Sequence, residues 1–420
     1  MSDVVIVGAG PAGLAAAVRS AENGCKVTLI DDNPTVGGQI WRGGAAANKN
    51  SAAMRWFNSI RSQKNISILN GRVVSADTEA RQLTVESLDN AATVSWRVLI
   101  LATGARELFL PFPGWTLPGV VGVGGLQALA KAGLPLTNKR IVVAGSGPLL
   151  LAAADYFRKH GAKVRMIAEQ ASRWRLARFG VGLFRCPEKL LQALQLRTSL
   201  HGIPYRTGSW ITRAEGNGSL QRVSLTDGRR TWTEECDYAA VAYGLWPNTE
   251  LATLLGCRMA AKAIAVDKHC RTSAPDILCA GEATGIGGLG LSLVEGEIAG
   301  LTAAGNLSAA NRLHSRRRAE ERFADRLKRA FALRPELKTL SEAATIVCRC
   351  EDVSFQRLHR SSSWREAKLH TRCGMGPCQG RVCGPALSVL FGWDFSSVRP
   401  PIFPARIGTL LENQNPGKRE

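Results

Sequence analysis

The chain has 420 residues, of which 45% are hydrophobic and 21% are charged. This composition is that of an ordinary folded protein and excludes a disordered chain. The length is enough for two or three domains, each with its own core. Lys and Arg exceed Asp and Glu by 20 charges, so a nucleic-acid partner has to be considered first.

The distribution of the basic residues argues against nucleic acid. They are spread along the chain, with one concentration at 312–329, where Glu320, Glu321 and Asp325 interleave with the arginines. Such mixed charge is typical of a solvated or partner-facing helix. An acidic partner protein or an anionic membrane surface is the alternative. We therefore expect no nucleic-acid partner.

The apolar stretches and the cysteines indicate the compartment. The N-terminal apolar run lacks a basic flank and a cleavage site, and no run is long enough to span a bilayer. Eleven cysteines, an odd number, indicate a reducing compartment in which thiols stay free or bind metal. A cytoplasmic location is therefore expected.

Residues 3–32 read as strand, glycine turn, helix and second strand. A β-branched run at 4–7 precedes the pattern G-x-G-x-x-G, and a strand at 25–30 ends at Asp31. The first glycine permits the tight turn, the second the approach of a pyrophosphate, and the third close packing of helix on strand. Asp31 lies where a carboxylate accepts from ribose hydroxyls. This unit predicts a nucleotide site rather than a simple glycine-rich turn, with Gly8, Gly10, Gly13 and Asp31.

The region after Asp31 continues the same site. A glycine-rich loop at 31–44 would run beside the bound nucleotide, and 66–101 reads as successive short strands. The last strand leads into Ala102-Thr103-Gly104, whose small residues let the backbone lie against a cofactor. The Pro- and Gly-punctuated segment 111–135 is typical of a crossing between domains.

A second nucleotide unit follows. A strand at 141–144, a turn, a helix at 149–160 and a strand at 162–168 repeat the first pattern, with the turn and acid being Gly145, Gly147, Pro148 and Glu169. The third glycine position holds Leu150, which keeps helix and strand apart. We expect a bound nucleotide here, while standard pyridine-nucleotide geometry is not expected.

A third contact to the first nucleotide is predicted near residue 280. A strand at 277–280 precedes Gly281 and Glu282, where an acid could contact a ribityl chain or phosphate. A helix expected to begin near Leu293 would direct its N-terminus at a flavin ring. An ordinary strand-to-helix turn is the alternative.

Five of the eleven cysteines lie close together near the C-terminus: Cys348, Cys350, Cys373, Cys378 and Cys383. Four thiolates suit zinc or an iron-sulfur cluster, and the C-x-C and C-x4-C spacings do not match zinc knuckles. We therefore expect a [2Fe-2S] cluster, with zinc and free thiols as alternatives. Spacing does not exclude any of the five. The cysteines near the flavin stretch form no redox pair, so a dithiol relay is not expected.

Several strings together carry a family resemblance that extends to about Gly408. They are GAGPAG, GGQIW, ATGARELFLPFPGWTLPGV, AGEATGIGG, CRCEDV and TRCGMGPCQGRVCG. The chain resembles the alpha chains of the family that contains opine oxidases, the HcnB-type component of hydrogen cyanide synthase, and heteromeric D-hydroxyproline and L-proline dehydrogenases. The resemblance implies an α/β, Rossmann-like flavoprotein of the glutathione-reductase type with two dinucleotide-binding domains. It also implies a small C-terminal domain like bacterioferritin-associated ferredoxin.

The resemblance also assigns residues. It implies FAD contacts at Gly8, Gly10, Ala12, Gly13, Asp31, Gln39, Ala102, Thr103, Gly104, Gly281 and Glu282. It implies cluster ligation by Cys348, Cys350, Cys378 and Cys383, which removes Cys373. The implied domains are FAD-binding (1–110 with 263–310), a second dinucleotide-binding domain (111–262), a basic helical linker (311–340), the [2Fe-2S] domain (341–395) and a tail (396–420).

The family's partners and extra cofactors enter by the same resemblance. It implies a beta subunit like D-amino-acid oxidase that oxidises a secondary amine, and it allows a small third subunit. Some relatives hold FMN at the subunit interface, and some hold ATP instead of NAD(P) at the second nucleotide site. Peripheral association with a membrane electron acceptor, at the inner face, is also allowed.

The expected function is therefore that of an electron-transfer subunit of a heteromeric amino-acid or opine dehydrogenase. The chain pairs a full FAD motif with a one-electron cluster and shows no recognisable substrate base; its catalytic residues stay unassigned. The rival hypothesis is a self-contained NAD(P)H-dependent reductase that passes electrons out through the cluster. A third hypothesis treats the chain as a scaffold for the catalytic subunit.

Overall fold

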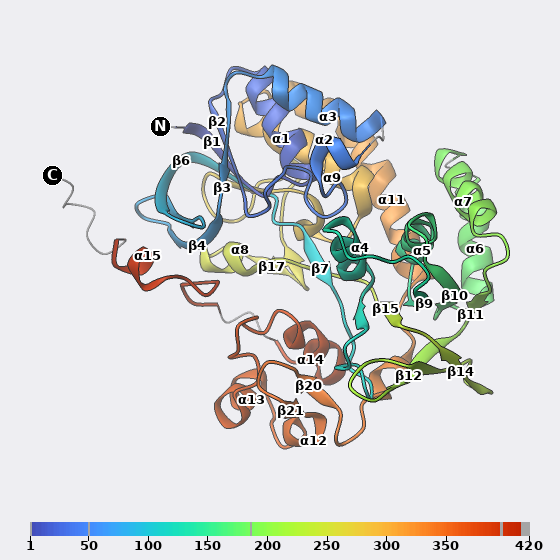
Figure 1. The fold of residues 1–420 in the computed structure, drawn as a ribbon. Helices are drawn as coiled ribbons and strands as arrows, with labels where there is room; N and C mark the ends of the chain where they lie inside the picture. The colour runs from blue at the N-terminus through green and yellow to red at the C-terminus, as the bar shows by residue number, and fades with distance from the viewer. Residues whose placement is uncertain (1, 49–50, 185–186, 395–397, 413–420) are drawn as a thin grey trace. The chain divides into compact units, whose positions relative to one another are not determined.

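A computed structural model describes residues 2–48, 51–184, 187–394 and 398–412. The chain forms two compact units (Figure 1). The first contains 1–106, 246–324 and 396–420, and the second contains 107–245 and 325–395. The five-part division expected from the sequence stays a prediction.

The first unit is built on a seven-stranded sheet with the order β3-β2-β1-β6-β5-β4, and β19 pairs with β6. The strands are β1 (Ser2–Val7), β2 (Val27–Asp31), β3 (Ile66–Asn70), β4 (Arg72–Asp77), β5 (Gln82–Glu86), β6 (Ala91–Leu101) and β19 (Ile277–Cys279). Residues 96–101 of β6 pair in parallel with β1, and residues 91–95 pair antiparallel with β5. One long strand therefore serves both the nucleotide-binding part of the sheet and an antiparallel meander.

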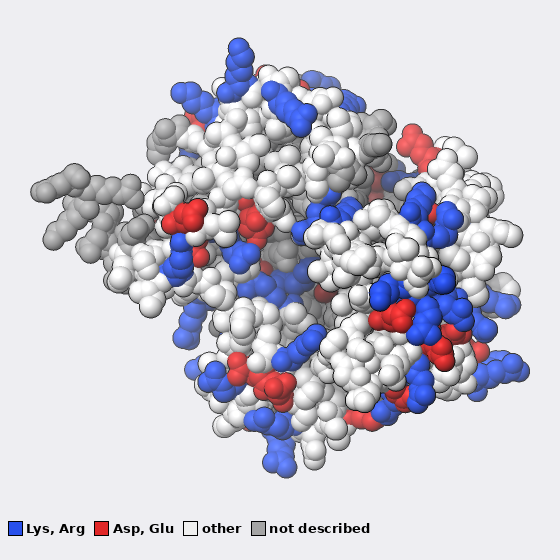
Figure 2. Space-filling model, in the orientation of Figure 1, with Lys and Arg blue, Asp and Glu red and all other residues white. Residues whose placement is uncertain are grey.

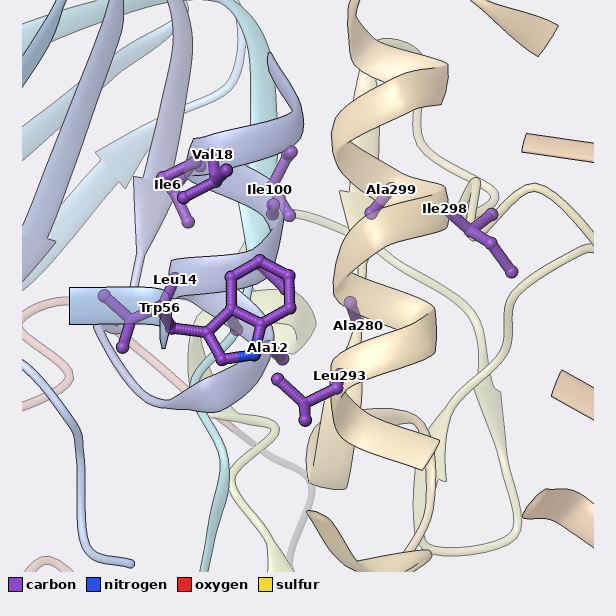
Figure 3. Close-up of a cluster of buried hydrophobic side chains, with 14 of the residues drawn as sticks. Ile6, Ala12, Leu14, Val18, Trp56, Ile100, Ala280, Leu293, Ile298 and Ala299 are labelled. Atoms are coloured by element: carbon purple, nitrogen blue, oxygen red, sulfur yellow. The ribbon is translucent and has the colours of Figure 1, made fainter. Parts of the chain in front are cut away.

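Two helices pack closely in the core of this unit. They are α1 (Pro11–Glu22) and α9 (Gly288–Ala303), and α3 (Ser51–Ser62) lies against α1. Figure 3 shows Leu14 and Val18 of α1 facing α9, with Trp56 beside them. Glycines permit the close approach: a Cβ on Gly296 would lie 2.2 Å from the carbonyl oxygen of Ala12.

Short elements complete the first unit. They are α2 (Gly44–Ala47), α8 (Glu250–Leu254), β17 (Met259–Ala260), β18 (Ala263–Ile264), the 3-10 turn Gly281–Thr284, α10 (Leu307–Arg312) and α15 (Ile407–Glu412). The described part of the C-terminal tail packs on the meander, because the amide of Ile402 donates to the carbonyl of Val74. Residues 396–397 and 413–420 of the predicted tail lie outside the described residues.

The second unit contains a five-stranded parallel sheet with the order β11-β10-β9-β15-β8. Its elements are β8 (Val120–Gly122), α4 (Val123–Lys131), β9 (Arg140–Gly145), α5 (Leu149–Lys159), β10 (Lys163–Glu169), α6 (Arg173–Leu183), α7 (Pro187–Ser199), β11 (Tyr205–Thr207) and β15 (Tyr238–Ala242). The antiparallel strands β12 (Trp210–Glu215), β13 (Arg222–Thr226) and β14 (Thr231–Glu235) form a separate sheet. The second strand-turn-helix-strand pattern is thus confirmed as secondary structure.

The cysteine-rich end of the second unit has a small core of its own. Its elements are β20 (Ile346–Cys348), β21 (Val353–Ser354), α12 (Phe355–Leu358), α13 (Trp364–Thr371) and α14 (Cys383–Phe391). Leu358, Trp364, Cys373 and Leu387 are among the buried residues of this core. A local apolar core around the thiols makes a defined site possible in a segment of this size.

The basic helix expected at 312–329 is observed as α11 (His314–Ala330), but it is not simply solvated. Arg316 bonds Glu297 at 2.8 Å, and Arg317, only 12% exposed, bonds Glu295 at 3.0 Å. Both glutamates lie on α9 and are 2% exposed. Two of its charges are therefore matched to buried carboxylates. On the face shown in Figure 2, basic side chains are dispersed and acidic side chains lie among them.

Two other differences from the sequence prediction concern helices. The helix expected near Leu293 begins at Gly288, five residues earlier, because the glycines at 287 and 288 supply backbone amides rather than a break. Helices α3, α6 and α7 were not predicted, and α7 has no buried residue among those described. No described helix is long and apolar enough to cross a membrane.

The close packing of α9 on α1 can be tested with Gly296→Ala. The added Cβ has no room against the Ala12 carbonyl, so the free energy of unfolding should fall by about 1–3 kcal/mol. The control is Gly180→Ala in α6, where an added Cβ meets no described atom within 4 Å. This control should leave stability unchanged or raise it by up to about 1 kcal/mol. Equal effects of the two variants in denaturant titrations would contradict the packing argument.

Candidate functional site

The first glycine turn has the close backbone contacts that the sequence predicts. Gly8 has a φ of +106°, and a Cβ there would lie 2.2 Å from the carbonyl oxygen of Ala102. A Cβ on Gly13 would lie 1.8 Å from the carbonyl oxygen of Gly8. Strand, turn and helix are therefore in backbone contact, and Ala102 follows the neighbouring strand β6. Only glycine fits at these two positions.

The helix after this turn starts without a side-chain cap among the described residues. Gly10 is the N-cap of α1, Pro11 follows it, and no acidic residue lies in the first turn. The first-turn amides and the positive end of the helix dipole are therefore suited to a phosphate group. Gly38 approaches Gly10 so closely that a Cβ on Gly38 would lie 2.8 Å from the Gly10 Cα. The neighbouring Gln39 is exposed and accepts a hydrogen bond from Arg42.

Asp31 lies at the carboxyl end of β2 and is half-buried. Its Oδ2 accepts from the amide of Ala9, and its Oδ1 accepts from the amide of Asn33 at 2.8 Å. These bonds fix the carboxylate beside the glycine turn. Its half-exposed position leaves it accessible to a ribose hydroxyl.

Thr103 and Gly104 are held by a residue that the sequence analysis missed, Asn248. The Thr103 hydroxyl donates to the Asn248 carbonyl at 2.7 Å, and the Asn248 side-chain amide donates to the Thr103 carbonyl at 2.8 Å. The Asn248 amide donates to the Gly104 carbonyl at 3.0 Å. Nothing near Asn248 in the sequence forms a recognisable motif, so this contact required the fold.

Gly281 is brought to the first helix. It has a φ of +81°, and a Cβ there would lie 2.7 Å from the Ala12 Cβ. Its amide donates to Glu295 at 2.9 Å, and the same carboxylate oxygen accepts from Thr284 at 2.7 Å. Glu295 was also missed, although an acid inside the apolar run LSLVEGEIAG is a signal that could have indicated it. Burial raises the pKa of Glu295.

Glu282 faces the start of α9. Its carboxylate accepts from the amides of Gly288 at 2.7 Å and Gly287 at 3.3 Å. Burial raises the pKa of Glu282, while these two amide bonds oppose the shift. The residue therefore caps α9 here, and its predicted contact to FAD stays a proposal.

The structure thus brings the predicted FAD residues to one place within the first unit. Gly8, Gly13, Ala102, Ala12 and Gly281 are joined by the backbone contacts described above. The uncapped α1 N-terminus, the half-exposed Asp31 and the close glycine packing suit a dinucleotide.

The second turn differs in its acid. Gly145 is as crowded as Gly8, since a Cβ there would lie 1.8 Å from the Ala242 carbonyl oxygen. Glu169 is fully buried and accepts from the amides of Gly147 and Ala171, each at 2.8 Å. Burial raises its pKa to about 7. A carboxylate buried and paired in this way is not presented to a ribose hydroxyl.

The start of the second helix also departs from the first. Pro148 is the exposed N-cap of α5, and Leu150 is fully buried in the core of the second unit. The residues at this turn therefore do not fit the arrangement that pyridine nucleotides need.

The cysteines form two groups within the second unit. The sulfur atoms of Cys348, Cys373 and Cys383 lie within 4.8 Å of one another, and all three residues are buried. Cys350 is exposed and Cys378 is partly exposed, and their thiols interact with each other. The structure therefore keeps Cys373 beside Cys383, at 3.9 Å, although the family resemblance leaves it out of the ligand set.

The surroundings of these thiols suit a metal or a cluster. Hydrogen bonds from Cys373 and Cys383 lower the pKa of Cys348, so this sulfur favours the thiolate form that binds metal. The amide of Gly374 donates to the Cys348 sulfur at 3.5 Å. Gly376 lets its loop approach Cys350, since a Cβ there would lie 2.3 Å from the Cys350 Cβ. Amide donors around sulfur are a known influence on cluster potential.

Comparison with known proteins agrees with the first site. Residues 2–306 match the pyridine nucleotide-disulphide oxidoreductase family, so the chain belongs to this family and is an FAD-dependent oxidoreductase. It is 32% identical to the HcnB subunit of hydrogen cyanide synthase from Pseudomonas aeruginosa, covering 90% of each chain. It is 30% identical to the A subunit of opine oxidase from Rhizobium meliloti, covering 99% of each. The resemblance drawn from the sequence motifs is confirmed.

A solved structure supports the fold. The L-proline dehydrogenase from P. horikoshii matches with a TM-score of 0.72 and 19% identity, covering 97% of this chain and 79% of that one. The expected α/β fold of the pyridine nucleotide-disulphide oxidoreductases is thus confirmed. The [2Fe-2S] character of the C-terminal region stays a prediction.

The burial of Glu169 predicts a pH dependence of stability. Its pKa is about 7 when folded and 4.5 when exposed, so between these values the unfolded chain releases a proton that the folded chain keeps. Stability is therefore lost as the pH rises through this window. Comparing about pH 5 with about pH 8, Glu169→Gln should remove about 3 kcal/mol of the loss seen in the wild type. Urea unfolding at both pH values measures this; parallel losses in both proteins would contradict it.

Proposed function

We propose that the chain is the electron-transfer flavoprotein and iron-sulfur subunit of a heteromeric dehydrogenase. The reaction would be oxidation of a secondary amine or imino acid, such as an opine, D-hydroxyproline, proline or glycine, on a partner subunit. The observation that carries the proposal is the presence, in one chain, of an intact FAD turn and a gathered set of cysteines. The described residues beside the flavin turn include no C-x-x-C dithiol that would do disulphide chemistry.

The chain's residues divide between holding the flavin and holding the cluster. FAD, when bound, can accept two electrons and release them singly, which a one-electron cluster requires. The α1 N-terminus and Asp31 would hold the pyrophosphate and ribose, and Thr103 and Gly104, fixed by Asn248, would place backbone beside the ring system.

The proposed ligands of the [2Fe-2S] cluster are Cys348, Cys350, Cys378 and Cys383. Cys348 and Cys383 already lie together, and the loop that carries Cys378 reaches Cys350. Cys373, buried behind Cys383, would donate a thiol hydrogen bond to a ligand sulfur rather than bind iron.

The relatives support a multi-subunit assembly, because both the hydrogen cyanide synthase chain HcnB and the opine oxidase chain that match are named as subunits. For this chain we propose a beta subunit like D-amino-acid oxidase. A small third subunit, an FMN at the subunit interface, and a membrane electron acceptor belong to the same proposal.

Cys378→Ala tests the proposed electron path. Because it removes a cluster ligand and leaves the first unit intact, FAD content should stay at wild-type level. The iron content and the cluster absorption should be lost, and substrate-to-dye transfer in the complex with the partner subunit should stop. Cys257→Ala, a buried cysteine in the first unit, is the matched control. Unchanged transfer in Cys378→Ala would refute the proposal.

Cys373→Ala tests the ligand assignment separately. If Cys373 only donates a hydrogen bond, the variant keeps two irons per chain and shifts the cluster potential to more negative values, because a donor to sulfur is lost. Iron analysis and a redox titration followed by electron paramagnetic resonance measure both quantities. Loss of iron in this variant, with iron retained in Cys350→Ala, would instead make Cys373 the ligand.

A further inference from the structure

The carboxyl ends of β9 and β10 carry polar residues that the proposed function does not use. Ser146 follows β9, and Gln170 follows β10; Ser146 is 8% exposed and Gln170 is fully buried. In open parallel sheets, ligands bind in the crevice outside the carboxyl ends of the strands. These two side chains therefore lie where the adenosine half of a nucleotide would meet the second turn.

Both side chains are already occupied by the chain itself. The Ser146 hydroxyl donates to the carbonyl of Phe331 at 3.0 Å. The Gln170 amide donates to Ser146 Oγ at 2.8 Å, and its nitrogen also lies 3.3 Å from the carbonyl of Ala332. The amide of Arg334 donates back to Gln170 Oε1 at 3.1 Å. The segment 331–334, which follows α11, thus forms a hydrogen-bonded strap across the ends of both strands.

Side chains fasten the strap on both sides. The Phe331 ring meets Phe179 of α6 edge-on, with centroids 5.4 Å apart. The Arg334 guanidinium lies over the Trp210 ring, 4.5 Å from its centroid. Arg175 of α6 donates to the Ala332 carbonyl at 3.0 Å. Each of these contacts lies within the second unit, so the strap is part of that unit's structure.

The amides of the turn are also used internally. The Ser146 amide donates to the Ala242 carbonyl at 2.7 Å, and the Gly147 amide donates to Glu169. A dinucleotide would need the acid for its ribose and the crevice for its adenine. Here the acid is buried and the crevice is filled.

We propose that residues 331–334 take the place of the adenosine part of a nucleotide at the second turn, and thereby exclude NADH, NADPH and ATP. Ser146 and Gln170 are the residues that determine this specificity, because they bind the strap's carbonyl and amide groups. The sequence alone predicted a nucleotide here, and this inference replaces that expectation. It concerns the isolated chain and does not depend on the proposed partner subunit.

The test uses the FAD-loaded full chain and the double variant Phe331→Ala/Arg334→Ala. This variant weakens the strap without altering the turn, by removing the aromatic and cation–π contacts. Strap opening should become about tenfold more frequent, measured as faster hydrogen exchange at the Arg334 amide. Equilibrium dialysis should find no saturable binding of NADH, NADPH or ATP to the wild type up to about 1 mM, the upper range of substrate affinities. The double variant should bind at least one of them at least tenfold more tightly.

Two control variants place the gained binding at this turn. Arg329→Ala changes an exposed residue of α11 and should leave exchange and binding as in the wild type. Pro148→Asp, added to the double variant, puts an acceptable N-cap with negative charge at α5 and should abolish the gained binding by repelling phosphate.

Two results would overturn the proposal. One is wild-type binding of any of the three nucleotides with the Arg334 amide still protected, since strap and nucleotide would then coexist. The other is a double variant with a fast-exchanging strap and no gain in binding. Neither result bears on electron transfer from the partner subunit, which is tested by Cys378→Ala.

Discussion

The candidate FAD site depends on how closely helix α9 can approach helix α1. Gly296 and Gly300 place the α9 backbone against the carbonyls of Ala12 and Ala16, with no space for a side chain. This contact brings Gly281 against Ala12 and completes the side of the site opposite the strands. Glu295 then ties Gly281, Thr284 and α11 together from inside α9. A buried carboxylate with these donors is stable only because each oxygen is satisfied.

The first strand-turn-helix-strand unit could be predicted from the sequence because its determinants are local. Gly8, Gly13 and Asp31 lie within one short segment and act through backbone geometry that follows from their spacing. Thr103 and Gly281 could be placed near the site for the same reason, as each follows a short buried strand. Their partners Asn248 and Glu295 could not, since each contact joins residues brought together only by the folded sheet and helices.

The second unit shows the opposite limit. Its turn and acid match the pattern, and the sequence correctly predicts the strands and the helix. What the pattern does not reveal is where the acid points and what lies over the crevice. Glu169 turns inward to two backbone amides, and a segment far along the chain, after α11, covers Ser146 and Gln170. A motif specifies the backbone path, whereas occupancy depends on distant parts of the chain.

Strand β6 has a consequence for how this protein tolerates insertions. Its first half belongs to the antiparallel meander, its second half is a central parallel strand, and it runs directly into Ala102. A one-residue insertion within β6 would turn every following side chain to the opposite face of the sheet and displace the small residues at the cofactor. The turns that join β4, β5 and β6 lie beyond this register and can change length freely. Sequence drift among homologues should therefore concentrate in the meander's turns and leave the length of β6 fixed.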